Sequence, residues 1–126
     1  MDFVKSMGGT TGIYCSGVEI MSFDDSAGRA VEAYGSVGVT AQALFRAEAV
    51  AVTMLRVAAG GEVGRHPAPA DQLLLITEGH GVVRTGGSAW ESVGAGQMVL
   101  WRAGEEHTTK AVDDITAVVI EMAVPG

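Results

Sequence analysis

The sequence predicts an all-β fold, either a barrel or a sandwich of short strands. In the second half of the chain, runs rich in β-branched residues recur about every ten residues, and glycine-rich turns separate them, a pattern typical of these folds. Glycine also occurs 18 times in 126 residues without a period. This distribution indicates many tight turns and excludes a collagen-like chain.

The individual elements follow from the alternation of apolar runs and turn residues. Glycine-bearing segments at 59–61, 78–81, 85–88 and 102–104 have the composition of turns. The runs around and between them are enriched in residues that favour strands. The expected strands are residues 50–57, 72–77, 81–84, 97–101, 107–112 and 116–122.

Residues 72–77 stand out because positions 73–76 are all apolar, which predicts a strand that is covered on both faces. A second copy of the chain is one such cover, and we therefore expect a homodimer. In the first half, residues 17–23 fit a strand, whereas 41–48 fit a helix or a strand, with the strand favoured by the all-β context. No linker or repeat divides the chain, so residues 1–126 are expected to form one domain, with N-terminal strands within 1–49.

Composition excludes several classes of function. With 48% hydrophobic and 18% charged residues the chain is expected to be globular. Its net charge of −7 argues against nucleic acid as a partner, because that binding requires clustered lysine and arginine. No signal peptide and no apolar run near the ~20 residues of a membrane helix are visible. Since Cys15 is the single cysteine, a reducing compartment, the cytoplasm, is expected, with no membrane partner.

Two of the three histidines and one glutamine form the candidate site. His66 follows a glycine-rich segment and opens a stretch that ends at Gln72, whereas His107 begins a strand with Thr109 and Ala111 on the same face. If the strands that carry Gln72 and His107 face each other across a barrel mouth, two imidazoles and an amide converge there. Such a group can hold a divalent metal.

These residues also stand at the spacings of two known motifs. The first runs glycine, five residues, His-x-His, three or four residues, glutamate, six residues, glycine; the chain has Gly60, His66, Ala68, Gln72 and Gly79 at these places. The second runs glycine, five residues, Pro-x-Gly, two residues, histidine, three residues, asparagine; the chain has Gly96, Arg102-Ala103-Gly104, His107 and Ala111. Over 60–79 and 96–111 the chain therefore resembles the cupins, and the resemblance implies a jelly-roll β-barrel, also called a double-stranded β-helix.

The chain departs from the motifs where the family holds its metal. Ala68 replaces the second histidine, Gln72 replaces the glutamate and Arg102 replaces the proline. The ligand set that the resemblance implies is therefore reduced to His66, Gln72 and His107. Losing one imidazole and one negative charge lowers the expected affinity for metal. The remaining donors suit a weakly held divalent ion, Zn, Ni, Fe, Cu or Mn, with water at the open positions.

Four further residues are candidates for a pocket: Met54, Ala68, Arg102 and Glu121. Arg102 lies close to His107 in the sequence and can attract an anionic ligand. Glu121 is a carboxylate late in an apolar strand, where it can act as a base or a ligand, or lie exposed at the strand end.

Other polar and aromatic residues have simpler interpretations. His80 lies in a turn and is expected on the surface. Glu105 or Glu106 can orient the imidazole of His107 or lie in a solvated loop. The larger apolar side chains fit a barrel core or a ligand pocket, with the core preferred; they are Met54, Met98, Trp90 and Trp101.

Two functions of different class remain open at this point. The first is a cupin-domain protein that binds a divalent metal, a small molecule or both in the barrel, without an assignable reaction. The alternative is a metal-dependent enzyme of the cupin oxygenase or isomerase type, in which the metal acts as a Lewis acid and Glu121 or a bound water handles protons. The missing ligands favour the binding protein, and the fold by itself does not decide.

Overall fold

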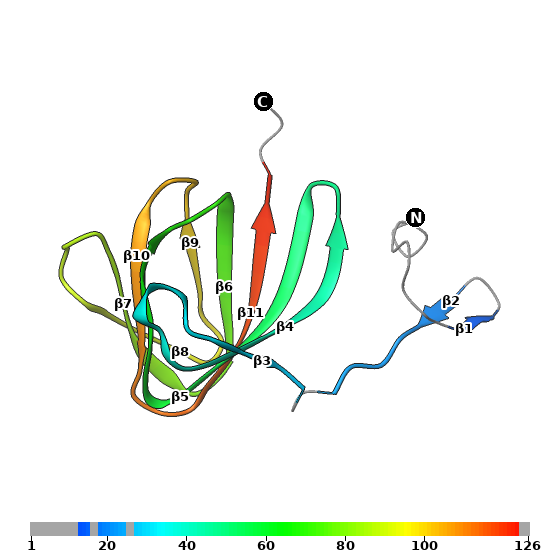
Figure 1. Ribbon diagram of the computed structural model, residues 1–126, viewed down its shortest axis with the longest axis horizontal. Coiled ribbons are helices and arrows are strands. Elements are labelled where there is room, and N and C mark those ends of the chain that lie inside the picture. Colours follow the sequence, from blue (N-terminus) through cyan, green and yellow to red (C-terminus); the bar gives the residue numbers. More distant parts are fainter. Residues whose placement is uncertain (1–12, 16–17, 25–26, 124–126) are drawn as a thin grey trace.

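The computed structural model describes residues 13–15, 18–24 and 27–123, and no α-helix occurs among them. Figure 1 shows a curved sheet wrapped into a nearly closed barrel, with a small two-stranded sheet beside it. This confirms the predicted all-β jelly-roll class. The elements are β1 (Ile13–Cys15), β2 (Val18–Ile20), β3 (Arg29–Val31), the 3-10 turn η2 (Ala33–Gly35), β4 (Val37–Ala47), β5 (Val50–Pro67), β6 (Asp71–Glu78), β7 (His80–Thr85), β8 (Glu91–Gly94), β9 (Met98–Trp101), β10 (Glu106–Ala111) and β11 (Ile115–Met122).

β5 is the strand that joins the two walls of the barrel. Its N-terminal part pairs with β4 and β11, whereas its C-terminal part pairs with β10. The sheet order is β8-β7-β10-β5-β11-β6-β9. In addition, β4 pairs with both β5 and β3. Because β5 hydrogen-bonds in both walls, the sheet rolls up around an interior that side chains can fill.

The predicted turn at 59–61 is wrong, because Val50–Pro67 is one continuous strand. Gly60 has a φ of +79°, a conformation that L side chains rarely adopt. A Cβ on Gly61 would lie 2.5 Å from the carbonyl oxygen of Val37. The two glycines therefore bend β5 where it passes between the walls and let β4 approach it closely, instead of ending the strand.

The core lies between the two walls and follows period-two alternation. On β6, Leu74 and Ile76 are buried in it, whereas Leu73 and Leu75 are half-buried on the outer face. The apolar run at 73–76 thus supplies both faces of one strand, and the predicted cover of its inner face is the barrel core. The other buried apolar residues are Val39, Val57, Ala68, Val83, Val93, Trp101, Ala111, Ile115, Ala117 and Val119.

Three large residues assigned to the core lie elsewhere, and one of them, Met54, lies on the outer face of β5. Met98 is 66% exposed, because it is the Cα partner of Leu75 and shares its outward face. Trp90 lies against the Arg84 guanidinium, 4.3 Å from the ring centroid, and against the Lys110 ammonium at 4.8 Å. Whether such a residue faces the core or the solvent depends on its pairing with neighbouring strands, and its hydrophobicity alone does not determine this.

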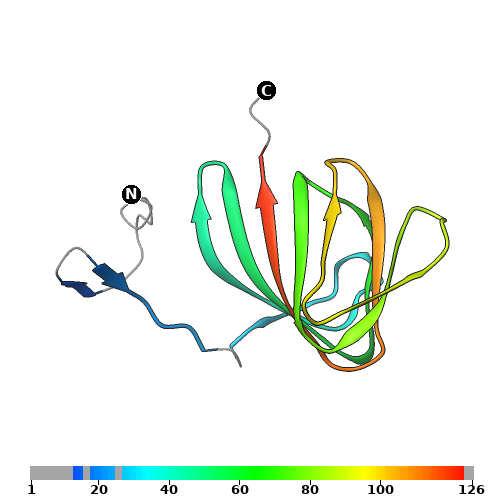
Figure 2. The same cartoon turned by 180° about the vertical axis from the view of Figure 1, so that it is seen from behind.

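The first half contains more strands than its sequence indicates. Of the segment 41–48, residues 41–47 belong to β4 and residue 48 lies in the following turn, because pairing with both β3 and β5 overrides its helical composition. The expected strand at 17–23 is reduced to β2, and residue 17 lies outside the described residues. β1 and β2 form a separate antiparallel pair that stands apart from the barrel in both views (Figure 2). The apolar side chains of Val18, Ile20 and Phe23 are exposed there.

Candidate functional site

A cavity of about 270 Å³ opens into the barrel between its walls. Residues of η2 and of seven strands, β3, β4, β5, β6, β9, β10 and β11, line it. Its volume lies just below the ~300 Å³ at which pockets for drug-sized ligands begin. The cavity is therefore suited to a small ligand.

A polar row crosses one wall of this cavity at a single level. Arg46 on β4 is the Cα partner of Ala51 on β5, and Ala51 pairs with Glu121 on β11. Glu121 in turn pairs with Gln72 on β6, which pairs with Trp101 on β9. Because directly paired residues share a face, a guanidinium, a carboxylate, an amide and an indole face the same space.

Below this row the cavity wall is mostly apolar. Two residues further along the strands, Thr53, Val119 and Leu74 form the next paired row. Leu55 follows on β5, and Val63 lines the cavity from the C-terminal part of the same strand. The cavity therefore has a polar rim and an apolar floor.

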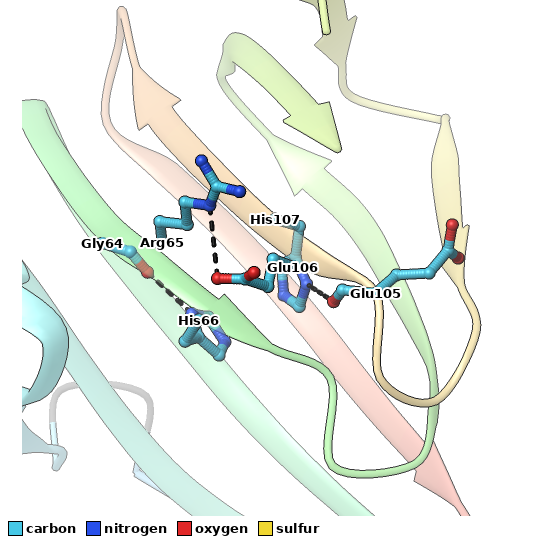
Figure 3. Close-up of polar contacts among 6 residues, drawn as sticks. All are labelled: Gly64, Arg65, His66, Glu105, Glu106 and His107. Atoms are coloured by element: carbon cyan, nitrogen blue, oxygen red, sulfur yellow. Dashed lines mark hydrogen bonds and ion pairs between the residues drawn. The ribbon is translucent and has the colours of Figure 1, made fainter. Parts of the chain in front are cut away.

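His66 and His107 face each other from neighbouring strands of the second wall. They are Cα partners on β5 and β10, and their ring centroids lie 4.4 Å apart. The Nδ1 atom of His66 lies 2.7 Å from the carbonyl oxygen of Gly64, and that of His107 lies 3.2 Å from the carbonyl oxygen of Glu105 (Figure 3). A carbonyl only accepts hydrogen bonds, so each Nδ1 carries the proton and each Nε2 keeps a lone pair when the ring is neutral.

An aromatic stack extends from this pair in both directions. The Trp101 ring stacks on His107 with centroids 4.0 Å apart and an interplanar angle of 14°. The buried indole is fixed by its Nε1–H, which donates to Oγ1 of Thr85 at 3.0 Å. On the other side, the Tyr34 ring stacks on His66 with centroids 5.1 Å apart. Both imidazoles are therefore held in place by packing as well as by hydrogen bonds.

Burial changes the acid–base behaviour of His107, whose residue is only 3% exposed. The pKa of His107 is lowered from 6.5 to about 4, mainly by desolvation and to a smaller extent by the nearby His66, against the opposing effects of the Glu105 backbone and carboxylate. His107 is consequently neutral at physiological pH, with its Nε2 lone pair available.

Tyr34 is held at the cavity by a strained turn. It has a φ of +57° and is the only non-glycine residue with positive φ in the described part of the chain. Its carbonyl oxygen lies so close to Gly64 that any Cβ at 64 would overlap it. The Gly64 N–H donates to Oγ of buried Ser36 at 3.1 Å, which ties the turn to β5. Strain of this kind persists where surrounding contacts fix the backbone.

With this geometry in view, comparison with known families is decisive. The model of the cupin domain family matches residues 53–123, more than half of the chain. The chain belongs to the cupin domain family. The matched segment contains most of β5 and all of β6 to β11, and therefore most of the polar rim and both histidines of this cupin.

Solved structures share the fold of this cupin at low sequence identity. A cupin superfamily protein of Desulfitobacterium hafniense has a TM-score of 0.64 at 19% identity, over 68% of this chain and 78% of that one. An RmlC-like cupin of Shewanella frigidimarina has a TM-score of 0.63 at 16% identity, over 69% and 78%. A cupin-2 domain protein of Rhodospirillum rubrum reaches 0.66 at 18% identity, over 79% and 70%. No curated protein matches the chain.

The structure brings together four of the residues singled out in the sequence. His66, Gln72, His107 and Glu121 all line the cavity of this cupin. Gln72 is buried and reaches it from β6, opposite the histidine wall. Thr109 also lines the cavity, two residues beyond His107 on the same face of β10, as alternation predicts.

Met54, Ala68 and Arg102 do not line this cavity. Met54 is the Cα partner of Val118 on the outer face of β5 and β11. Ala68 lies in the core just past the end of β5, where its N–H donates to the Glu105 carbonyl oxygen. The Arg102 side chain is 68% exposed and pairs with Asp71 at 3.2 Å, so the place of the motif proline is occupied by a surface ion pair.

Of the two alternatives for Glu105 and Glu106, the structure supports exposure, since both residues are exposed. The backbone carbonyl of Glu105 accepts from the imidazole of His107, whereas the Glu105 carboxylate accepts from the Arg102 backbone N–H at 2.6 Å. Glu106 pairs with Arg65 at 3.3 Å (Figure 3). His80 lies on the surface as expected and contacts Asp113.

Three cavity residues have no motif in the sequence. Tyr34 lies in a turn with positive φ, and the only sign of that turn in the sequence is the adjacent Gly35. Arg29 and Arg46 line the cavity from β3 and β4, outside the segments matched by the two motifs. An arginine preceded by an apolar strand is too common a pattern to mark a site.

Within the described residues, no group of three or more His, Cys, Asp and Glu side chains is arranged to hold a metal ion. Those residues also contain no helix long and apolar enough to cross a membrane.

Proposed function

We propose that this cupin is a binding protein for a small molecule in its barrel cavity. The observation that carries the proposal is the preorganised histidine pair, in which both Nδ1 atoms are engaged by backbone carbonyls and both imidazoles border the cavity. Convergent polar groups over an apolar floor are typical of small-molecule sites. No reaction is assigned, because the fold hosts many chemistries and no catalytic residue is identified.

The same pair supports a divalent metal as a second candidate ligand. Metal-bound histidine characteristically donates its other ring N–H to a carbonyl or carboxylate, which is the arrangement at His66 and His107. Their Nε2 atoms and the amide oxygen of Gln72 would be the protein donors, without a carboxylate in the implied motif position. This set fits Zn, Ni, Cu or Fe held weakly, and Mn less well because it prefers oxygen donors. A metal bound there would supply a Lewis acid.

Trp101 provides a direct test of binding in the cavity. In a Trp90→Phe background its emission reports on the cavity, because its ring stacks on His107. We expect a ligand from a library of small metabolites to change this emission and raise the melting temperature. The cavity-filling variant Val119→Phe should abolish both effects, whereas Val118→Phe, on the adjacent outward position, should retain them. Equal binding by both variants would place the ligand elsewhere.

Metal binding is tested separately on protein purified without a histidine tag. We expect Zn²⁺ or Ni²⁺ to bind the wild-type chain near one ion per chain, and His66→Ala/His107→Ala to lose it. His80→Ala is the matched control, because it removes an exposed histidine away from the cavity. Absence of metal after reconstitution would eliminate the metal candidate and leave the small-molecule proposal standing.

We also propose a homodimer that forms through the outer face of one wall. Leucine, isoleucine, valine and methionine side chains form two continuous apolar rows across β9, β6, β11 and β5, without a charged residue. Contiguous exposed apolar rows of this kind mark protein interfaces. The rows are Leu100, Leu73, Ile120 and Val52, and Met98, Leu75, Val118 and Met54.

Light scattering at micromolar concentration should give a mass of twice 12.9 kDa. Leu73→Glu/Leu75→Glu should reduce it to one chain with an unchanged far-ultraviolet spectrum. Val112→Glu, at an exposed apolar residue just past β10, should leave the dimer intact. A wild-type mass of one chain would contradict the proposal.

We infer a cytoplasmic location, since a single cysteine is compatible with a reducing compartment.

A further inference from the structure

The charges around the cavity differ in sign from the charge of the whole chain. The chain has a net charge of −7, which on average repels anions. The side chains that line the cavity nevertheless include two guanidinium groups, Arg29 and Arg46, and one carboxylate, Glu121. The side chain of neither arginine makes an ion pair or hydrogen bond with another described residue. Within the described part of this acidic protein, two guanidinium groups without an ion-pair partner therefore border the cavity.

Both arginines lie on the same side of the cavity, on neighbouring strands. Arg46 is on β4, and Arg29 is on β3, where it pairs with Ala41, five residues before Arg46 along β4 and roughly 16 Å from it. Long guanidinium side chains from these two positions can approach the space between them. Glu121 lies two strands from Arg46, with Ala51 between them in register, a separation of roughly 10 Å across the sheet. The described residues contain no ion pair between the Glu121 carboxylate and Arg46. The carboxylate makes the opposite end of the polar row unfavourable for a second anionic group.

The histidine wall cannot take the place of the arginines as an anion donor. In both histidines Nδ1 is engaged with a backbone carbonyl, that of Gly64 at His66 and that of Glu105 at His107. In the neutral ring the remaining Nε2 atom has a lone pair, which accepts hydrogen bonds and so repels an anionic oxygen. An anion entering the cavity is consequently directed towards Arg29 and Arg46, where guanidinium groups can form charge-assisted hydrogen bonds.

The remainder of the cavity is matched to an uncharged, apolar body. Leu55, Leu74 and Val119 form the floor, and Val31 lines the side next to Arg29. The cavity volume of about 270 Å³ limits that body to a small aliphatic or aromatic group. A cationic side formed by β3 and β4, an acidic opposite end and an apolar floor define a ligand with one anionic head and a short apolar tail.

We infer that the ligand of this cavity is a small organic monoanion, a carboxylate or a sulfonate, whose head lies between Arg29 and Arg46 and whose apolar part lies on the floor formed by Leu55, Leu74 and Val119. This inference rests on the proposed function, since it names the ligand class of the same cavity. The inference predicts that a ligand with one negative charge binds more tightly than a neutral ligand and more tightly than a ligand with two negative charges.

The test compares hexanoate, hexane-1-sulfonate, hexanamide and adipate on chelator-treated protein, so that coordination to a metal does not contribute. Binding is followed through Trp101 emission in the Trp90→Phe background. Hexanoate or hexane-1-sulfonate should bind at least about tenfold more tightly than hexanamide, because a charge-assisted hydrogen bond is worth more than a neutral one. Adipate should bind more weakly than hexanoate because its second carboxylate approaches Glu121.

The variants separate a binding role from a structural one. Arg29→Gln/Arg46→Gln should remove the advantage of the anions and leave hexanamide binding unchanged. Arg65→Gln, which loses the same charge at the exposed ion pair with Glu106, should retain the advantage. If the double variant fails to fold, the single variants are used, because each replaces an exposed residue. Each should lose part of the advantage of the anions over hexanamide while keeping the melting temperature of the wild type.

The possible failures are distinguishable. Equal or tighter binding of hexanamide would overturn the monoanion inference while leaving the small-molecule function intact. Equal binding of adipate, or equal loss of hexanoate and hexanamide in the arginine variants, would also overturn it. No binding of any probe at millimolar concentration, by fluorescence and by melting temperature, would overturn the inference and the proposed function together.

Discussion

Replacing Gly79 with alanine should lower the free energy of unfolding by roughly 3–5 kcal/mol, the sum of backbone strain and overpacking. Gly79 separates β6 from β7 and has a φ of +83°. A Cβ at this position would overlap the carbonyl oxygen of Asp114 and lie 3.1 Å from Cα of Ile115, both backbone atoms at the start of β11. Because backbone cannot move aside as a flexible side chain does, the barrel must distort to accept the methyl group.

Gly96→Ala is the matched control for this experiment. Gly96 has nearly the same φ, +87°, but a Cβ there would meet no atom within 4 Å. Its substitution should therefore cost only the left-handed strain, about 1–2 kcal/mol. Urea denaturation of both variants measures the two free energies, and equal losses would show that the contact with β11 contributes nothing.

Acidification should destabilise the metal-free protein through His107 by on the order of 3 kcal/mol between neutral pH and pH 4. The folded-state pKa is about 4, below the 6.5 of the unfolded chain, so the unfolded state takes up the proton first as the pH falls. This contribution to stability is complete above pH 6.5, declines between pH 6.5 and 4, and does not change further below pH 4.

The measurement is the urea midpoint of chelator-treated protein at several pH values across this window. Carboxylates also titrate near its acidic end, so the relevant quantity is the difference between wild type and His107→Gln. The variant should show a shallower decline, because glutamine takes up no proton in either state. The matched control is His80→Gln, which makes the same substitution at an exposed histidine outside the cavity. Identical profiles for wild type and His107→Gln would contradict the assignment.

The sequence predicts the features that depend on spacing within one strand or between neighbouring turns. Glycine positions and histidine positions together locate His66 and His107, which the structure places as Cα partners on β5 and β10. The apolar run at 73–76 predicts a strand that is covered on both faces, and its inner face contributes Leu74 and Ile76 to the core. These signals are local, because they follow from period-two alternation and from turn chemistry.

Arg46 shows why other parts of the site are not visible in the sequence. Simple alternation from Ala41, which lines the cavity, would place Arg46 on the outer face. A register shift between Ala43 and Phe45 reverses the facing of the following residues and turns Arg46 inward. The bulge is fixed by pairing with β5, so it depends on tertiary structure. Tyr34 is hidden for a related reason, since its conformation is set by Gly64 and Ser36, about thirty residues apart in the chain.

The continuity of β5 has a consequence for how the molecule tolerates changes in its chain. By composition, segment 59–61 looks like a permissive loop for an inserted tag or a new pair of termini. In the structure it is the covalent link between the wall that carries Glu121 and Gln72 and the wall that carries the two histidines. An insertion there would interrupt β5 and change how the two walls are placed relative to each other. The turn at 86–88 is a better site, because an insertion there leaves the pairing of β5 in both walls intact.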